Sequence, residues 1–166
     1  MPTIGDNKVS HRILIVDDNP KLRDLVRDIL LEERAGDRIV TASSASDALA
    51  VVHHEPADVL ITDWQMPPGM DGLTLIETVQ FLHPETQAIL MTTADQDEVH
   101  ERSFKRPASF TFFAKPFSIE AFLAHIDQLL TQRDIAAEMP LDAVQGDGDE
   151  GSHRSKPGLR PALSWG

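Results

Sequence analysis

The sequence contains no cysteine, so disulfide bonds and thiol chemistry are excluded. No apolar run reaches the roughly 18 residues that a membrane-spanning helix needs, and the first ten residues lack the apolar segment of a signal peptide. Basic residues are few: 15 Lys and Arg stand against 27 acids, a net charge of −12, which argues against direct binding to nucleic acid. These absences predict a cytoplasmic protein with no membrane span and no nucleic-acid partner.

With 166 residues, of which 41% are hydrophobic, the chain can form one domain with a modest extension. Residues 1–10 are predicted to be an N-terminal extension, residues 11–132 the domain, and residues 133–166 a disordered tail rich in Gly and Pro. The tail is acidic up to Gly151, then turns basic and ends near Trp165. It is either a solvated extension or a docking peptide anchored by Trp165.

Five short apolar segments, residues 12–16, 38–42, 58–62, 88–91 and 110–113, are predicted to be strands. A segment with helical periodicity follows each of them. The helix over residues 95–106 is poorly amphipathic, with only Val99 and Phe104 as apolar anchors. This alternation predicts an α/β fold, a doubly wound five-stranded parallel sheet covered by helices on both faces.

Four of the five predicted strands end in residues that can perform chemistry. The first ends on Asp17 and Asp18, the third on Asp63, the fourth on Thr93 and the fifth on Lys115. A single acid at a strand end is most simply a loop residue. The carboxyl ends of parallel strands, however, meet at one edge of the sheet, where ligands bind in folds of this class. We therefore expect these side chains to lie together.

Three converging carboxylates repel one another unless a cation neutralises them. Oxygen ligands without His or Cys suit a hard ion, and Mg²⁺ is the expected one. The ammonium group of Lys115 and the hydroxyl group of Thr93 add donors for an anion. A carboxylate, a Mg²⁺ ion, a cation and a hydroxyl are the components of an aspartyl-phosphate site.

On these residues the chain resembles the receiver domain of two-component response regulators, in the stand-alone form typical of chemotaxis regulators. The resemblance runs from about His11 to Gln132 and includes the segments Asp63-Trp64-Gln65-Met66-Pro67 and Lys115-Pro116-Phe117. It implies a flavodoxin-like fold with strand order 2-1-3-4-5. It also implies a single-domain response regulator of a phosphorelay, which signals through protein contacts.

The resemblance further implies a role for each site residue. Asp63 would accept a phosphoryl group from a histidine kinase or a histidine phosphotransfer protein, and the protein would catalyse its own phosphorylation and dephosphorylation rather than act as an ordinary enzyme. The Mg²⁺ ion would be held by Asp18, Asp63 and the Gln65 backbone carbonyl, with Asp17 acting through water. Thr93 and Lys115 would hold the phosphoryl oxygens, and Thr93 with Phe112 would form the conformational switch.

Three departures from the family pattern concern the surroundings of the site. Pro68-Gly69 adds one residue to the loop beside the metal position. Phe112 stands where Tyr is frequent, so the switch side chain has no hydroxyl. Pro107-Ala108-Ser109 precedes the last strand and predicts an early end for the helix before it.

Two other functions are compatible with the pattern. The first is a protein-binding module that keeps the fold but works without phosphorylation, which the complete set of acids, hydroxyl and lysine argues against. The second is a Mg²⁺-dependent phosphatase with an Asp nucleophile. Such hydrolases generally need a second acid two residues after the nucleophile, where this chain has Gln65.

Overall fold

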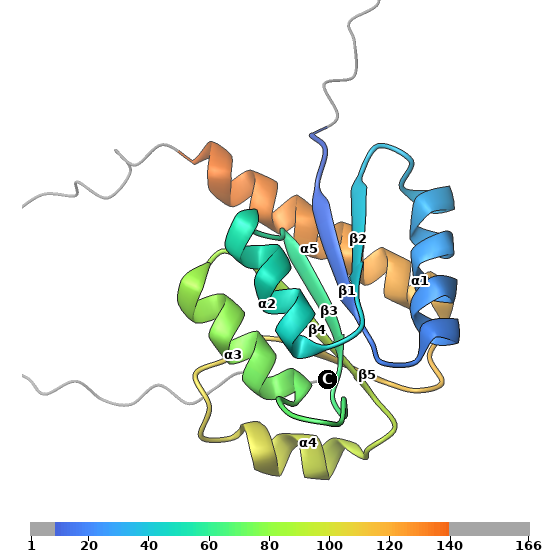
Figure 1. The fold of residues 1–166 in the computed structure, drawn as a ribbon. Coiled ribbons are helices and arrows are strands. Elements are labelled where there is room, and N and C mark those ends of the chain that lie inside the picture. The colour runs from blue at the N-terminus through green and yellow to red at the C-terminus, as the bar shows by residue number, and fades with distance from the viewer. Residues whose placement is uncertain (1–8, 140–166) are drawn as a thin grey trace, which may run out of the picture.

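The computed structural model describes residues 9–139, which form an α/β domain (Figure 1). All five strands are parallel, in the order β2-β1-β3-β4-β5, as predicted. The strands are β1 (Arg12–Val16), β2 (Arg38–Ala42), β3 (Val59–Asp63), β4 (Gln87–Thr92) and β5 (Thr111–Ala114). The helices are α1 (Pro20–Glu33), α2 (Ala45–His54), α3 (Gly72–Leu82), α4 (Gln96–Ser103) and α5 (Ile119–Glu138).

The sheet separates two hydrophobic layers because successive side chains of a strand point to opposite faces. Leu14 and Val16 of β1 pack with α2 and α3 in one layer, while Ile13 and Ile15 pack with α1 and α5 in the other. All four are fully buried. The middle of each central strand is therefore apolar on both faces, which leaves the strand ends as the place for polar groups.

Each helix begins at a residue whose side chain accepts a hydrogen bond from a backbone N–H of the first turn. These capping residues are Asn19, Ser44, Asp71, Asp95 and Ser118. Except for Asp71, these caps lie within a few residues of a strand end, so they also shape the loops around the carboxyl edge of the sheet.

Helix α4 differs from the prediction. It ends at Ser103, in agreement with the early end expected from Pro107-Ala108-Ser109, and Val99 is its buried residue. The prediction that Phe104 anchors this helix is wrong, since Phe104 is 75% exposed. Phe104 is the C-cap residue, and its ring lies tilted at 57° to that of His100, with 6.1 Å between ring centroids, instead of entering the core.

Helix α5 continues to Glu138, six residues beyond the predicted domain boundary at Gln132 (Figure 1). The apolar stripe stops at Leu130, but Arg133 forms an ion pair with Asp58 and Asp134 lies 3.0 Å from the buried His11. These charges keep the last turns against the sheet. Neither α5 nor any other helix within residues 9–139 is long and apolar enough to cross a membrane. The rest of the predicted tail, including Trp165, lies outside the described residues.

Candidate functional site

Asp63 is the last residue of β3, and the chain on either side of it is tightly held. The N–H of Trp64 donates to the Met91 carbonyl oxygen at 3.0 Å, and the N–H of Gly72 donates to the Trp64 carbonyl oxygen at 2.8 Å. The side chain of Asp63 is 14% exposed. The loop between Trp64 and Gly72 is thus closed by a hydrogen bond between its two ends. It holds the Asp63 carboxylate at the edge of the sheet, where part of that group is exposed to solvent.

Lys115 follows the end of β5 and extends across β4 toward Asp63. Its Nζ atom lies 2.8 Å from Asp63 Oδ1 and 3.4 Å from Asp17 Oδ2. Its backbone N–H donates to the Thr92 carbonyl oxygen at 2.7 Å, which continues the β4–β5 ladder by one residue. A cation is therefore fixed between two of the predicted acids.

Asp17 and Asp18 directly follow the end of β1, as predicted. Asp17 is 1% exposed, and its Oδ1 atom accepts the Asn19 N–H at 2.8 Å, while Asp18 is exposed. Carboxylate oxygens of Asp17, Asp18 and Asp63 lie within 4.8 Å of one another. Three hard oxygen donors at this spacing suit a divalent cation such as Mg²⁺.

The electrostatics of Asp63 favour a cation in this position. Burial raises the pKa of Asp63 above its ordinary value, and the negative charges of Asp17 and Asp18 raise it further. The hydrogen bond and charge of Lys115 act in the opposite direction without fully compensating. The site therefore holds more negative charge than its lysine neutralises, which a bound divalent ion would balance.

The two threonines at the end of β4 have different environments. Thr92 is 2% exposed, and its Oγ1 atom accepts the Ala94 N–H at 3.0 Å. Thr93, the predicted hydroxyl, is exposed and belongs to the segment that leads into α4. Thr92 thus has a structural role at the end of β4, whereas Thr93 is exposed at the surface.

The sequence matches the family model described as response regulator receiver domain over residues 13–127. The chain belongs to this family of two-component systems. It is 30% identical over 112 residues to sporulation initiation phosphotransferase F of Bacillus subtilis, covering 68% of this chain and 87% of that one. The solved structure of a CheY-like receiver domain protein from Methanospirillum hungatei superposes with a TM-score of 0.69 at 27% identity, covering 77% of this chain and 99% of that chain.

Other relatives are longer regulators. The chain is 31% identical over 123 residues to the nitrogen assimilation regulatory protein NtrX of Azorhizobium caulinodans, covering 74% of this chain but only 26% of NtrX. The receiver domain thus spans about a quarter of that relative. The similarity to NtrX concerns the receiver portion and extends no further.

In this receiver domain the predicted switch residue Phe112 lies on β5, two strands away from Asp63 in the sheet. It is partly buried and packs against the hydrophobic layer that contains α2, α3 and Val99 of α4. The layer below Lys115 is aromatic instead: Phe113, Phe117 and Phe122 pack together, with Phe117 and Phe122 stacked at 4.9 Å between centroids. These rings support the turn that carries the lysine.

Sequence reasoning missed several residues that shape the site. Arg23 of α1 donates from Nη1 to the Asp17 carbonyl oxygen at 2.9 Å. Trp64 is 2% exposed, and the guanidinium carbon of Arg102 lies 5.4 Å from its ring centroid. Arg102 and Trp64 are far apart in the sequence, so their contact has no local sequence signal, whereas Arg23 is only six residues from Asp17.

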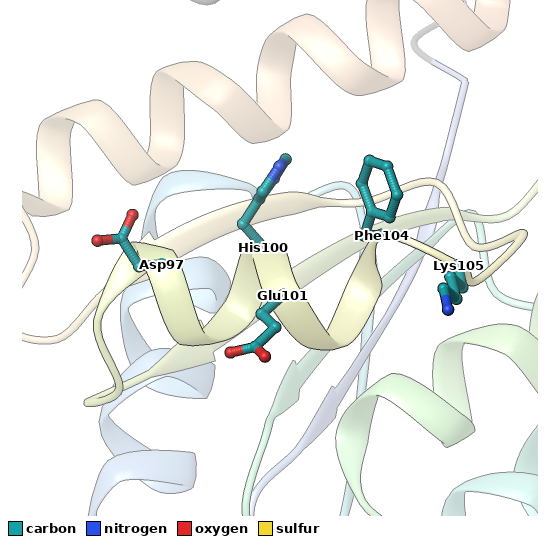
Figure 2. Close-up of a pocket in the computed structure, with 5 residues that line it drawn as sticks. All are labelled: Asp97, His100, Glu101, Phe104 and Lys105. Atoms are coloured by element: carbon teal, nitrogen blue, oxygen red, sulfur yellow. The ribbon is translucent and has the colours of Figure 1, made fainter.

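A hollow of about 600 Å³ lies on α4, and none of Asp17, Asp18 and Asp63 lines it (Figure 2). It is lined by Asp97, His100, Glu101, Phe104 and Lys105. Figure 2 shows His100 and Phe104 projecting from the same side of the helix, with Glu101 on the other. No residue of the predicted site lines this hollow, so it is a surface feature of α4 separate from the acid cluster.

Proposed function

We propose that this receiver domain is a single-domain response regulator that accepts a phosphoryl group on Asp63 from a phosphohistidine. The donor would be a histidine kinase or a histidine phosphotransfer protein in the cytoplasm. The observation that carries the proposal is the contact of Lys115 Nζ with Asp63 Oδ1 at 2.8 Å, beside Asp17 and Asp18. Stand-alone status follows the Bacillus relative, 87% of which this chain covers.

In the transfer step, an Asp63 carboxylate oxygen forms a bond to phosphorus as the phosphorus–nitrogen bond to the donor imidazole breaks. Because Lys115 donates a hydrogen bond to Oδ1 of Asp63, the second carboxylate oxygen, Oδ2, is the one available to attack the phosphorus atom. The same ammonium group stabilises negative charge on the transferred oxygens, and the exposed Thr93 hydroxyl donates to another. The protein thus supplies position and charge, while the donor supplies the energy.

The residues present fit a Mg²⁺ ion. One carboxylate oxygen of Asp17, Oδ1, already accepts a hydrogen bond from the Asn19 N–H, and the other, Oδ2, lies 3.4 Å from Lys115 Nζ. Because both oxygens already have partners, Asp17 would contact the ion through a water molecule. The exposed Asp18, together with Asp63 and the Gln65 backbone carbonyl, would be direct ligands. A bound Mg²⁺ would neutralise the acids and the incoming phosphoryl oxygens.

The proposed switch couples Thr93 to Phe112. When Thr93 moves toward a phosphoryl oxygen, it vacates space that the partly buried Phe112 ring can fill, which shifts the population between two packings. Thr93→Ala should still accept the phosphoryl group but respond less to it. Equal chemical shift changes around Phe112 in wild type and Thr93→Ala would contradict this coupling.

Output is proposed to occur through protein contacts made by α4. This helix begins three residues after Thr93, and it carries the exposed Phe104 beside the hollow with His100. An exposed aromatic ring at the edge of a hollow is a suitable anchor for a partner. The identity of that partner is left to experiment.

Incubation with acetyl phosphate and Mg²⁺, followed by intact mass, tests the proposed function. We expect one added phosphoryl group on wild type and none on Asp63→Asn, which keeps the shape but has no nucleophile. Asp18→Ala should form the adduct slowly and need more Mg²⁺. A fully labelled Asp63→Asn would refute the assignment. Absence of any adduct would favour a binding module, and rapid release of phosphate without accumulation would favour a phosphatase.

A further inference from the structure

Helix α4 has little hydrophobic attachment to the rest of the domain. Only Val99 among its eight residues is buried, and the helix carries five charged side chains (Asp97, Glu98, Glu101, Arg102 and, when protonated, His100). An amphipathic helix of this size normally presents a wider apolar stripe to the core. Its position must therefore depend on contacts other than burial.

Two arginines one turn apart supply such contacts. Arg106, just after the helix, donates from Nη1 to Glu77 Oε2 at 3.0 Å and to Thr74 Oγ1 at 3.2 Å on α3. Arg102 places its guanidinium group over the ring of Trp64, 5.4 Å from the centroid. A cation within about 6 Å of an indole face is attracted by the ring, and Trp is the strongest such acceptor.

Trp64 is well suited to transmit a change at the phosphoacceptor. It is bonded directly to Asp63, is 2% exposed, and is fixed through its backbone to Met91 and Gly72. Its backbone is therefore tied to the strand end, and burial restricts the movement of its ring. Arg102 by contrast is on the surface, with a side chain 60% exposed and a second partner, Glu98, at 3.6 Å.

From this geometry we infer that Arg102 is a positioning residue, which holds α4 in its resting place through Trp64. The link is separate from Thr93 and Phe112: it runs along the chain from Asp63 to Trp64 and then across to α4. Since Arg102 and His100 lie on α4 and Phe104 is its C-cap residue, release or strengthening of the contact moves the surface proposed for output. The regulatory consequence rests on the proposed function, whereas the resting contact does not.

The resting contact can be tested in the full-length protein without phosphorylation. Arg102→Gln removes the cation and keeps a polar side chain with the same first three carbon positions. Backbone amides of α4 should then exchange with solvent about two- to fivefold faster, the size expected for loss of an exposed cation–π contact. In a Trp165→Phe background, the emission maximum of Trp64 should also shift. Arg102→Lys should restore both properties in large part.

Glu98→Gln is the matched control, because it removes the other partner of Arg102 and leaves the ring contact. It should leave Trp64 emission unchanged. Equal exchange and equal emission in Arg102→Gln and wild type would overturn the inference, whatever the phosphorylation chemistry does. Matching effects of Glu98→Gln and Arg102→Gln would also overturn it, since the ion pair would then be responsible.

A second arm measures the regulatory consequence with acetyl phosphate and Mg²⁺. Arg102→Gln should accept the phosphoryl group on Asp63 to the same extent as wild type. The shift changes of Phe104 and His100 on phosphorylation should fall to about half or less, as expected when one of two links is lost. Undiminished changes would refute the regulatory role. A wild-type protein that forms no adduct refutes the proposed function instead, and the exchange experiment still decides the resting contact.

Discussion

A Cβ atom added to Gly72 would lie 2.1 Å from the backbone carbonyl oxygen of Asp63. The first residue of α3 therefore touches the peptide group of Asp63, and the contact leaves room only for glycine. The same residue donates its N–H to the Trp64 carbonyl oxygen at 2.8 Å. Any side chain at position 72 would push apart the two ends of the loop that holds Asp63.

Gly72→Ala should destabilise the domain by about 1–3 kcal/mol, the usual cost of overpacking, because the atoms nearest the added Cβ belong to the backbone of Asp63 and Trp64 and cannot rotate away. It should also slow phosphorylation of Asp63. Urea unfolding and the rate of adduct formation check the two effects. Gly69→Ala is the comparison: a Cβ there meets no atom, although a φ of 114° strains it. It should lose stability while Asp63 keeps its position. Wild-type stability in Gly72→Ala would show that the loop can yield.

The pKa of Asp63 is raised by burial first and by Asp17 and Asp18 in addition, against the effect of Lys115. The folded state thus retains a proton at pH values where the unfolded carboxyl, with an ordinary value of 3.8, has lost it. The stabilising effect of this proton is complete below the unfolded pKa and is lost as the pH rises through the folded pKa.

At pH 7 without divalent ions, Asp63→Asn should therefore unfold at higher urea than wild type, and the gap should narrow as the pH falls toward 4. Unfolding series with a chelator present measure both. Mg²⁺ should stabilise wild type, by about 2.7 kcal/mol at one hundred times its dissociation constant, and stabilise Asp63→Asn less. A wild type more stable than Asp63→Asn at neutral pH without metal would contradict the charge argument.

Asp95 and Gln65 are expected to affect the lifetime of the phosphoryl group, since both are exposed residues of the two loops beside Asp63. Asp95 has a second role: its Oδ1 atom accepts the Glu98 N–H at 2.8 Å and caps α4. Asp95→Asn keeps a capping side chain but removes the charge, so stability should change by less than about 0.5 kcal/mol while the dephosphorylation rate changes severalfold. Asp95→Ala, which also loses the cap, should cost about 1 kcal/mol. Unchanged rates in Asp95→Asn and in Gln65→Ala would remove both residues from this role.

The last turns of α5 should contribute to stability through charges. Asp134 lies 3.0 Å from His11, which also faces Asp37 at 3.4 Å, and Arg133 pairs with Asp58. Truncation after Gln132 should be less stable than truncation after Met139 by about 1–3 kcal/mol, because the partners of these residues stay buried or half-buried. Arg27→Ala, which removes only surface pairs with Asp24 and Asp28, should change stability by less than about 1 kcal/mol. Equal unfolding curves for the two truncations would place the domain boundary at Gln132 after all.

The sequence predicted the elements whose signal is local. The bounds predicted for β1 and β2, residues 12–16 and 38–42, agree with the structure because an apolar run acts within a few residues. The convergence of Asp17, Asp18, Asp63 and Lys115 was predictable for a different reason: parallel strands with the same direction bring their ends together whatever the loops do. Their roles in phosphoryl transfer stay predictions.

What the sequence did not reveal depends on contacts across the fold. Phe104 reads as a core residue by composition, but the helix ends one residue earlier and leaves the ring outside. The apolar stripe of helix α5 ends at Leu130 and predicts an early end for the helix. Arg133 and Asp134 nevertheless continue it, because they pair with Asp58 and His11. Arg102 and Trp64 are 38 positions apart and meet only because α4 packs beside the β3 end.

The charged contacts of α5 also fix where a reporter can be attached. His11 and Asp58 precede β1 and β3, so they mark the amino edge of the sheet, while Asp63 lies at the carboxyl edge. A five-residue strand separates the two edges by roughly 15 Å. A fluorophore on Met139→Cys, at a position that is 63% exposed, would therefore lie away from the acid cluster. Because the chain has no native cysteine, the double variant Met139→Cys/Phe104→Cys would carry a donor and an acceptor dye at these two sites alone, and the distance between the dyes would report the position of α4.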